Sequence, residues 1–210
     1  MSDEDEEDEL PDGGASFGWF NDLFVFDTVN KKWSQPMQRN LGVPTPRAAL
    51  GLCAVDKDLV IFGGRDTQGR RNDLHIFDTD SFKWKECKIK GRQPEPRSFH
   101  STTAVGKRVV VMGGRGEKNQ HFADLHIFDT ETHEWLQPKV NGDLPCGRGQ
   151  HSVAVVDNKL VLYGGTTDFN AEIMQCQTFC NDLYITDIED FLKGGSTQQP
   201  TNGHSEASSS

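Results

Sequence analysis

The sequence predicts an all-β fold in which a four-stranded unit recurs about every 50 residues. The phrase Asn-Asp-Leu-x-x-Phe-Asp-Thr, or a close variant of it, occurs four times, beginning at residues 21, 72, 123 and 181. A tryptophan follows the phrase three times with a constant spacing of 51 residues, and a di-glycine ends three apolar runs. A fixed period of this kind is typical of architectures that repeat one supersecondary unit.

The middle unit shows the four strands most clearly. We expect them at Ser101–Val105, Val109–Gly113, Asp124–Asp129 and His133–Pro138, because β-branched and apolar residues dominate these runs. The polar sequence Asp-Thr-Glu-Thr at 129–132 is typical of the turn between the last two strands. The units on either side repeat this pattern, so we expect about three and a half four-stranded blades.

The recurring glycines and tryptophans are interpreted as structural. Glycine pairs let the backbone turn and pack closely where an apolar strand ends, and a tryptophan on the fourth strand supplies apolar area between blades. These residues are Gly63, Gly64, Gly113, Gly114, Gly164, Gly165, Trp33, Trp84 and Trp135.

The two ends of the chain differ in composition from its centre. The chain of 210 residues has a net charge of −10, but eight acidic residues lie within residues 1–12 and leave −2 for the remainder. We expect an acidic disordered leader at residues 1–16, repeats at 17–192 and a disordered polar tail at 193–210, because neither end has enough apolar residues to form a core.

Charge is also unevenly distributed between the connections of the repeats. Antiparallel strands place the second-to-third and the fourth-to-first connections on one side of the fold, which we call the loop face. Its charged residues are Arg65, Arg70, Arg71, Lys88, Lys90, Arg92, Arg97, Arg115, Lys118 and Arg148, against Asp66, Glu95, Glu117 and Asp143. This excess predicts a surface that attracts anions; the alternative is a set of solvated loop charges.

Four features recur in register: the di-glycine, the Asn-Asp-Leu, the spaced tryptophan and an arginine after a turn, as in Pro46-Arg47, Pro96-Arg97 and Gly147-Arg148. Over residues 17–192 the chain therefore resembles the kelch family of β-propellers. The resemblance implies an all-β, partial kelch β-propeller, since the propellers that it resembles have six blades.

Within that family, the stretch from Gly18-Trp19 to Leu74 resembles the receptors around kelch domain-containing protein 2. Those proteins are substrate receptors of cullin–RING ubiquitin ligases, and their propellers bind C-terminal degradation signals, typically ending in Gly-Gly. The chain looks like the C-terminal half of such a receptor.

This resemblance also implies a binding site for a peptide C-terminus. Arg65 and Arg70, five residues apart after a di-glycine, would clamp the terminal carboxylate. Ser98 would bond the same group, and Trp19 and Phe99 would line the pocket, with Phe99 standing where the family has a tryptophan. Two guanidinium groups and a hydroxyl group match the acceptor oxygens of a carboxylate.

We therefore expect a non-enzymatic module whose partners are protein or peptide C-termini. The alternative is a generic kelch scaffold that binds a folded partner through its basic loop face. A remote alternative is an oxidase-type propeller enzyme, which needs an assembled set of Tyr and His ligands. The resemblance further implies a cullin–RING ligase adaptor as a partner, although the leucine-rich helical tail that docks such receptors has no counterpart after Leu192.

Composition narrows the remaining classes of function. We expect no metal, no cofactor and no nucleic-acid partner, because the repeats are not net basic and carry no regular Cys and His spacing. We expect no membrane association, because no run of apolar residues is long enough to span a bilayer. Five irregularly spaced cysteines without a signal peptide favour a cytoplasmic or nuclear protein.

Overall fold

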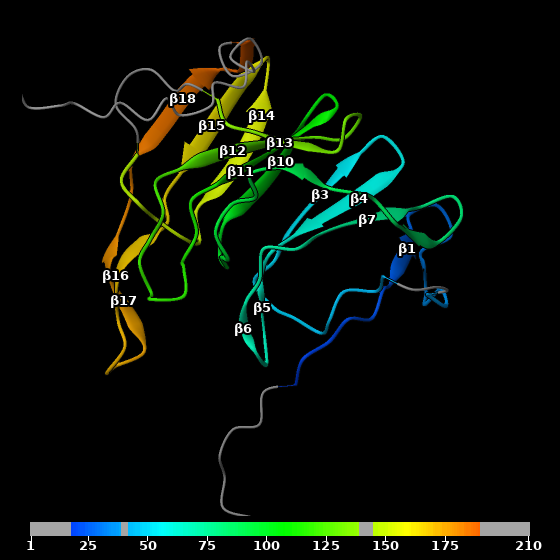
Figure 1. Ribbon diagram of the computed structural model, residues 1–210, viewed down its shortest axis with the longest axis horizontal. Coiled ribbons are helices and arrows are strands. Elements are labelled where there is room, and N and C mark those ends of the chain that lie inside the picture. Colours follow the sequence, from blue (N-terminus) through cyan, green and yellow to red (C-terminus); the bar gives the residue numbers. More distant parts are fainter. Residues whose placement is uncertain (1–17, 39–41, 139–144, 190–210) are drawn as a thin grey trace, which may run out of the picture.

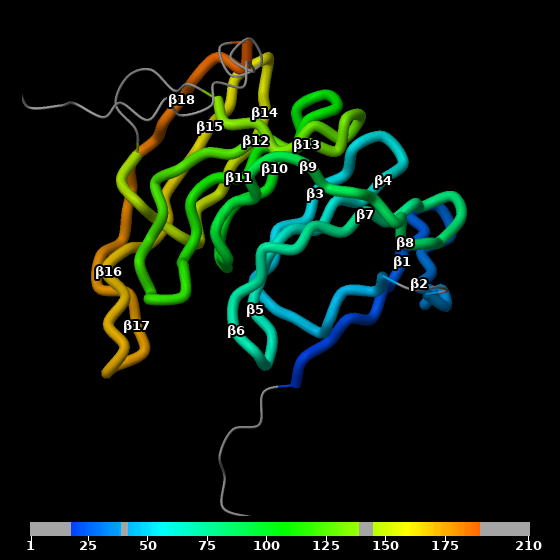
Figure 2. The backbone as a smooth tube through the Cα atoms, in the orientation of Figure 1, coloured from blue at the N-terminus to red at the C-terminus, as the bar shows by residue number. Residues whose placement is uncertain are grey.

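The computed structural model describes residues 18–38, 42–138 and 145–189. The expected acidic leader (1–16) and polar tail (193–210) lie outside these residues. The described chain forms a series of antiparallel sheets that follow one another along an arc (Figures 1 and 2). Among the described residues, no helix is long and apolar enough to cross a membrane.

The first complete blade is a four-stranded antiparallel sheet in the order β3-β4-β7-β8. Its strands are β3 (Gly51–Val55), β4 (Asp58–Phe62), β7 (Leu74–Asp78) and β8 (Lys83–Lys85). Each apolar second strand is covered on both sides by its neighbours, which explains the run of β-branched and aromatic residues in β4.

The second complete blade follows the expected strands closely. It contains β10 (Ser101–Val105), β11 (Arg108–Met112), β12 (Leu125–Asp129) and β13 (Glu134–Leu136). A short strand, β9 (Lys90–Gly91), pairs in parallel with the outer edge of β13. The connection that leads into this blade therefore also extends its sheet to five strands.

Two incomplete blades flank these sheets. The hairpin of β1 (Val25–Asp27) and β2 (Lys32–Ser34) precedes them, and a three-stranded sheet of β14 (Ser152–Val156), β15 (Lys159–Tyr163) and β18 (Leu183–Asp187) follows them. The described chain thus contains a half blade, two complete blades and one blade of three strands. This agrees with the expected partial all-β propeller.

The connections between second and third strands form further hairpins. In the first complete blade β5 (Arg65–Asp66) pairs with β6 (Gly69–Arg70), and in the last sheet β16 (Thr166–Asn170) pairs with β17 (Gln175–Phe179). Both hairpins point to the lower side of the molecule in Figure 1, beside the β11–β12 connection. The second-to-third connections thus share one side, as the strand order requires.

The core lies between consecutive blades. Trp135 on β13 packs with its ring centroid 4.9 Å from that of Phe62, which belongs to the preceding blade. Both side chains are almost completely buried. The other buried members of this cluster are Val55, Val60, Ile76, Val109, Val111 and Phe128. The tryptophan of the second complete blade therefore covers the second strand of the blade before it, whereas Trp84 packs against Phe77 of its own sheet.

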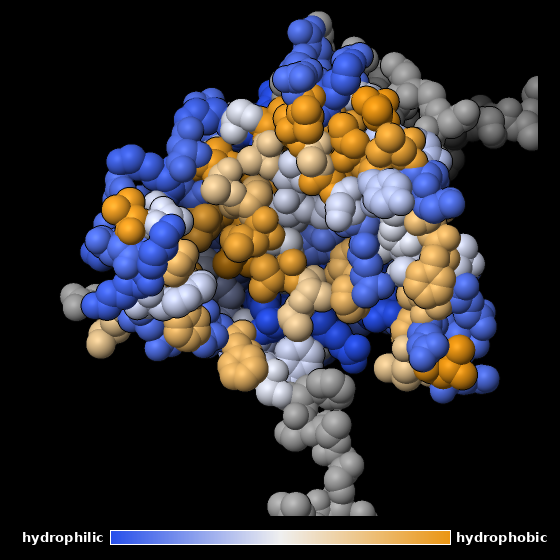
Figure 3. All heavy atoms as spheres, turned by 180° about the vertical axis from the view of Figure 1, so that it is seen from behind, coloured by the Kyte–Doolittle hydropathy of each residue, from blue (hydrophilic) through white to orange (hydrophobic). Residues whose placement is uncertain are grey.

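Trp33 does not follow this pattern. Its side chain is 64% exposed and packs against Phe26 within its own hairpin. The described residues contain no blade on the outer side of this hairpin, so the expected contact between blades is not made. Large apolar side chains are also exposed on the last sheet, at Tyr163, Leu183 and Ile185. Figure 3 shows apolar side chains gathered across the middle of one surface, with charged ones mainly around it.

The di-glycines lie at the ends of the second strands with left-handed backbone angles. Gly113 has φ of 59° and Gly114 has φ of 100°. A Cβ atom on Gly113 would lie 2.6 Å from the carbonyl oxygen of Arg148 in the next repeat, so the two backbones approach too closely for a side chain.

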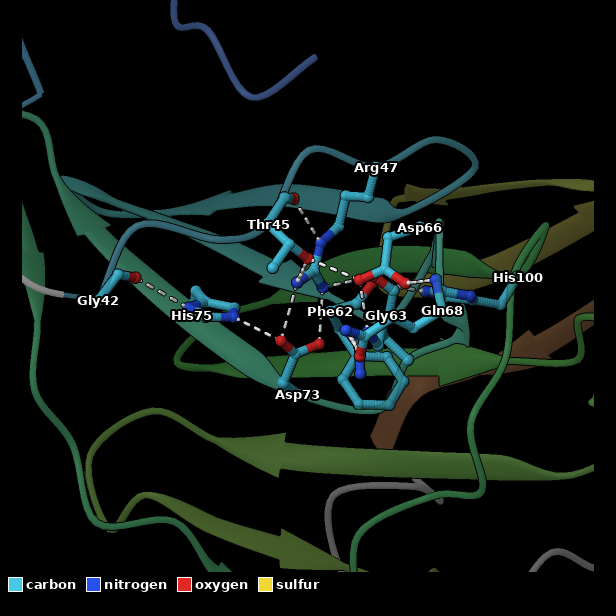
Figure 4. Close-up of polar contacts among 11 residues, drawn as sticks. Gly42, Thr45, Arg47, Phe62, Gly63, Asp66, Gln68, Asp73, His75 and His100 are labelled. Atoms are coloured by element: carbon cyan, nitrogen blue, oxygen red, sulfur yellow. Dashed lines mark hydrogen bonds and ion pairs between the residues drawn. The ribbon is translucent and has the colours of Figure 1, made fainter. Parts of the chain in front are cut away.

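A buried arginine joins the recurring parts of each repeat. In the first blade Arg47 donates two hydrogen bonds to Asp73, of 2.6 and 2.8 Å, and one of 3.0 Å to the carbonyl of Gly63 (Figure 4). Arg97 contacts Asp124 and Gly113 in the same way, and Arg148 contacts Asp182 and Gly164. We call these three pairs the Arg–Asp clamps.

The clamps have a clear electrostatic signature. Burial raises the pKa of Asp73, but the hydrogen bonds from Arg47 and His75 outweigh burial and hold this pKa well below its ordinary value. The hydrogen bonds from Arg148 likewise lower the pKa of Asp182 to about 2. Each carboxylate is therefore ionised at neutral pH beside an arginine that is almost completely removed from water.

Replacing Arg97 by glutamine should lower the free energy of unfolding by about 3 kcal/mol, because Asp124 and the Gly113 carbonyl lose a charged, bidentate donor. Urea denaturation followed by tryptophan fluorescence measures the change. As a control, Lys57→Gln removes the exposed ion pair with Asp80 and should change stability by less than about 0.5 kcal/mol. A loss for Arg97→Gln no larger than that of the control contradicts the structural role.

Stability should also fall as the pH is lowered from about 6.5, the ordinary pKa of histidine, towards 4. Burial lowers the pKa of His100 to about 3 and that of His151 to about 4, with further lowering from Arg97 and Arg148 respectively. The unfolded chain therefore takes up protons in this range that the folded chain cannot accept. Urea midpoints at several pH values should show a smaller pH dependence in His151→Gln; an unchanged dependence contradicts this assignment.

Candidate functional site

The loop face carries less free charge than the sequence suggested. Arg97 and Arg148 are held by the Arg–Asp clamps, with Arg97 fully buried. Arg71 forms an ion pair of 2.6 Å with Asp66. Arg97 and Arg148 recur with the repeat and serve its architecture, as their regular spacing favours, so they add no free charge to the loop face. The charge of Arg71 is likewise neutralised by an aspartate of its own repeat. Asp143 lies outside the described residues.

A second group of arginines remains on this face without such a partner. Arg65 and Arg70 are paired residues of the β5–β6 hairpin, whose turn is closed by a hydrogen bond of 2.9 Å from the Gln68 amide to Asp66. Arg65 is exposed, whereas Arg70 is 9% exposed. Among the described acidic residues, none forms an ion pair with either guanidinium group. The structure thus brings together the two arginines that the sequence predicts as a carboxylate clamp.

Ser98 lies directly behind this hairpin. Its hydroxyl oxygen accepts a hydrogen bond of 3.0 Å from Nε of Arg70, and the side chain is completely buried. A second bond of 3.1 Å joins Arg70 to Oδ1 of Asn119 on the next repeat. Both partners belong to the repeat that follows Arg70, and this repeat fixes the position of its side chain.

Arg115 stands next to this group and occupies the same place after its di-glycine as Arg65. Its backbone pairs with Ser98 through hydrogen bonds of 2.7 and 3.0 Å. Its guanidinium carbon lies 3.8 Å from the ring centroid of Phe169 and 5.0 Å from that of Phe99. The residue is 8% exposed, and its Nε is buried without a hydrogen-bond partner.

These arginines are close enough to affect one another. Burial lowers the pKa of Arg70, and the positive charges of Arg115 and Arg65 lower it further. Burial and the charge of Arg65 also lower the pKa of Arg115. Burial, together with the positive charges of Arg115 and Arg70, lowers the pKa of His121, which favours its neutral form. We call Arg65, Arg70 and Arg115 the arginine cluster.

A cavity of about 310 Å³ opens beside the cluster, between the second complete blade and the last sheet. Arg115 and Phe99 line it together with His121, Gln150, Phe169 and Phe179. Its walls combine aromatic rings, one cation and an amide group. Such a lining suits a ligand with an apolar part and a small anionic group.

The second residue after each clamp arginine has the same backbone conformation in all three repeats. Ala49, Phe99 and Gln150 all have left-handed φ angles, between 53° and 61°. The Phe99 amide donates a hydrogen bond of 3.0 Å to Ala49, and the Gln150 amide donates one of 2.8 Å to Phe99. This chain of bonds between blades presents Phe99 and Gln150 to the cavity.

Trp19 lies apart from the cavity lining. The Phe20 carbonyl beside it accepts a hydrogen bond of 3.1 Å from the Arg47 amide, and the next residue, Ala48, pairs with Arg65. Trp19 is half-buried, and Phe20 is 71% exposed. The structure thus does not place the predicted aromatic residue in the cavity.

Sequence reasoning missed Arg115 and His121 as site residues. Arg115 had a detectable signal, because Gly-Gly-Arg occurs both at 63–65 and at 113–115. His121 had none, since it reaches the site through a loop that pairs locally with Arg115. No group of His, Cys, Asp and Glu among the described residues could hold a metal ion. All five cysteines are free thiols.

Comparison with known proteins gives a consistent result. Residues 12–206 match the KLHDC2/KLHL20/DRC7 Kelch-repeats domain. The chain is 33% identical over 175 residues to Kelch domain-containing protein 1 of Mus musculus, which covers 80% of this chain and 42% of that protein. It is 30% identical over 149 residues to the Rab9 effector protein with kelch motifs of Rattus norvegicus, covering 70% and 40%.

A third relative is Acyl-CoA-binding domain-containing protein 4 of Arabidopsis thaliana, which is 38% identical over 144 residues. The match covers 67% of this chain and 21% of that protein. The chain therefore spans less than half the length of these relatives.

We expect Arg115 to lower the free energy of unfolding, whereas the clamp arginines raise it. Arg115→Gln removes an uncompensated buried cation, and we expect the free energy of unfolding to stay unchanged or to rise by about 1 kcal/mol, since the lost cation–π contacts are weaker than the desolvation relieved. Urea denaturation beside Arg97→Gln tests this expectation. A loss comparable to that of Arg97→Gln contradicts it.

Proposed function

Because the chain belongs to the KLHDC2/KLHL20/DRC7 family of kelch-repeat domains, we propose that it is a non-enzymatic module that binds the C-terminal carboxylate of a protein or peptide. The observation that carries this proposal is the pair Arg65 and Arg70 on one hairpin, with no described carboxylate in an ion pair with either. The binding site is the arginine cluster together with the adjoining cavity.

The pair suits a carboxylate for physical reasons. An ionised carboxylate has two oxygens that accept several hydrogen bonds, and guanidinium groups donate to it in a bidentate way. Arg70 is already held by Ser98 and Asn119, so little side-chain freedom is lost when it binds a ligand. Arg65 is exposed and free to close on the same group.

The surroundings of Arg70 favour a slender C-terminal end. Arg70 is 9% exposed and bonded to Ser98 and Asn119, so residues without side chains would let a peptide backbone approach it closely. This supports a preference for peptides that end in Gly-Gly, as the resemblance implies.

In the receptors that this chain resembles, such binding selects substrates for a ubiquitin ligase. Contact with a ligase adaptor is not supported by the described residues, since the segment after Glu189 lies outside them. A cytoplasmic or nuclear location belongs to the proposal and agrees with five reduced cysteines.

The proposal is tested with a fluorescent peptide that ends in Gly-Gly, prepared with a free C-terminal carboxylate and with a C-terminal amide. We expect amidation to weaken binding at least about tenfold, which corresponds to about 1.4 kcal/mol. Fluorescence anisotropy measures both dissociation constants. Equal affinity for the two peptides overturns the proposal and favours a kelch scaffold that binds a folded partner.

Substitutions in the hairpin give an independent test. Arg65→Ala and Arg70→Ala should each weaken binding of the free acid at least about tenfold, and the difference between acid and amide should shrink. Lys118→Ala is a matched control, because Lys118 is an exposed cation on the same side of the molecule. A similar loss in Lys118→Ala would show that only the general charge of the face matters.

A further inference from the structure

Arg115 differs from the three clamp arginines, which are buried as well. Arg47, Arg97 and Arg148 each bind an aspartate and a backbone carbonyl, so their charge is compensated within the repeat. Arg115 is buried to a similar degree, yet no described acidic residue pairs with it and its Nε has no hydrogen-bond partner.

The neighbours of Arg115 do not replace an anion. Glu117 points instead to the amide of Arg70, at 2.6 Å, and Asp168 accepts a hydrogen bond of 2.6 Å from Thr178. Two aromatic rings flank the guanidinium group, and such contacts contribute only about 0.5–2 kcal/mol. Removing a cation from water costs several kcal/mol, which is more than these contacts return. The buried Arg115 therefore lowers the stability of the folded protein unless a ligand supplies negative charge.

Arg115 lies where a ligand could supply the missing negative charge. Arg115 lines the 310 Å³ cavity, and the residue opposite its backbone is Ser98, whose hydroxyl group binds Arg70. The charge of Arg115 lowers the pKa of Arg70, so the two guanidinium groups are near neighbours on one surface. A ligand that reaches Arg70 can therefore also reach Arg115.

We infer that Arg115 and the cavity form a second subsite, which binds the carboxylate side chain of a Glu or Asp residue near the C-terminus of the bound peptide. This inference rests on the proposed function, because the terminal carboxylate at Arg65 and Arg70 fixes the direction of the peptide. The Gly-Gly end occupies the last two positions of such a peptide. The acidic residue therefore stands at the third position from the C-terminus or further upstream.

A carboxylate fits this subsite better than a doubly charged anion. One guanidinium group offers a bidentate pair of donors, which a single carboxylate satisfies. His121, the other basic group at the cavity, is favoured in its neutral form and adds no positive charge. Phe99 and Phe169 provide apolar walls for the methylene groups of a glutamate side chain.

The test uses ten-residue peptides of glycine and serine that end in Gly-Gly, with one Glu or one Gln at the third, fourth or fifth position from the C-terminus. We expect the Glu peptide to bind about tenfold more tightly than its Gln counterpart at one of these positions. In Arg115→Gln this preference should disappear, while affinity for the Gln peptide stays the same. Fluorescence anisotropy measures the dissociation constants of all six peptides, once with the full chain and once with the variant.

The outcomes separate the inference from the proposed function. Equal affinity for Glu and Gln peptides at every position, with binding still lost on amidation, overturns the second subsite and leaves the proposed function intact. Equal affinity for acid and amide ends overturns the proposed function. A preference for Glu that persists in Arg115→Gln overturns the assignment to Arg115.

A folding control completes the design. Arg115→Gln is compared with Lys118→Gln, which removes a nearby exposed cation without changing the cavity. If both variants lose the Glu preference equally, the effect is one of general charge and the inference is wrong. Unchanged urea denaturation of Arg115→Gln shows that a lost preference does not come from unfolding.

Discussion

The Arg–Asp clamp is the interaction on which the rest of the structure depends. A single buried guanidinium group connects three parts of a repeat: the turn that carries it, the carbonyl of the di-glycine and the aspartate that begins the third strand. Because burial of a charge is tolerable only when it is paired and hydrogen-bonded, all three parts must be in place together. Asp73, Asp124 and Asp182 therefore determine where each second-to-third connection ends.

This constraint divides the basic residues of the loop face into two chemical kinds. The clamp arginines are paired with aspartates of their own repeats and are buried away from any ligand. The arginine cluster follows the di-glycines, where the backbone has just been fixed by a clamp, and its side chains project from rigid positions. Arg70 and Arg115 are thus held in place while their charge remains uncompensated, which is the arrangement expected of a preorganised anion site.

The repeated fold was predictable because it depends on local signals. Di-glycines, turn residues and apolar runs recur with one period, and the strands of the second blade lie within about two residues of the expected bounds. The candidate site was harder to predict from the sequence. Arg97 and Arg115 both follow turns and read alike in the sequence, but only the folded chain shows that one meets Asp124 and the other meets two phenyl rings. Trp33 is exposed for a similar reason, since its burial depends on a neighbouring blade.

The chain of hydrogen bonds through Ala49, Phe99 and Gln150 has a consequence for how binding preferences can diverge. One backbone geometry there carries a methyl group, a phenyl ring and an amide. The bonds between blades use only main-chain atoms, so the side chain can change without altering how the blades are joined. Substituting the side chains at these positions can therefore change what the site binds while the backbone contacts between the blades stay the same.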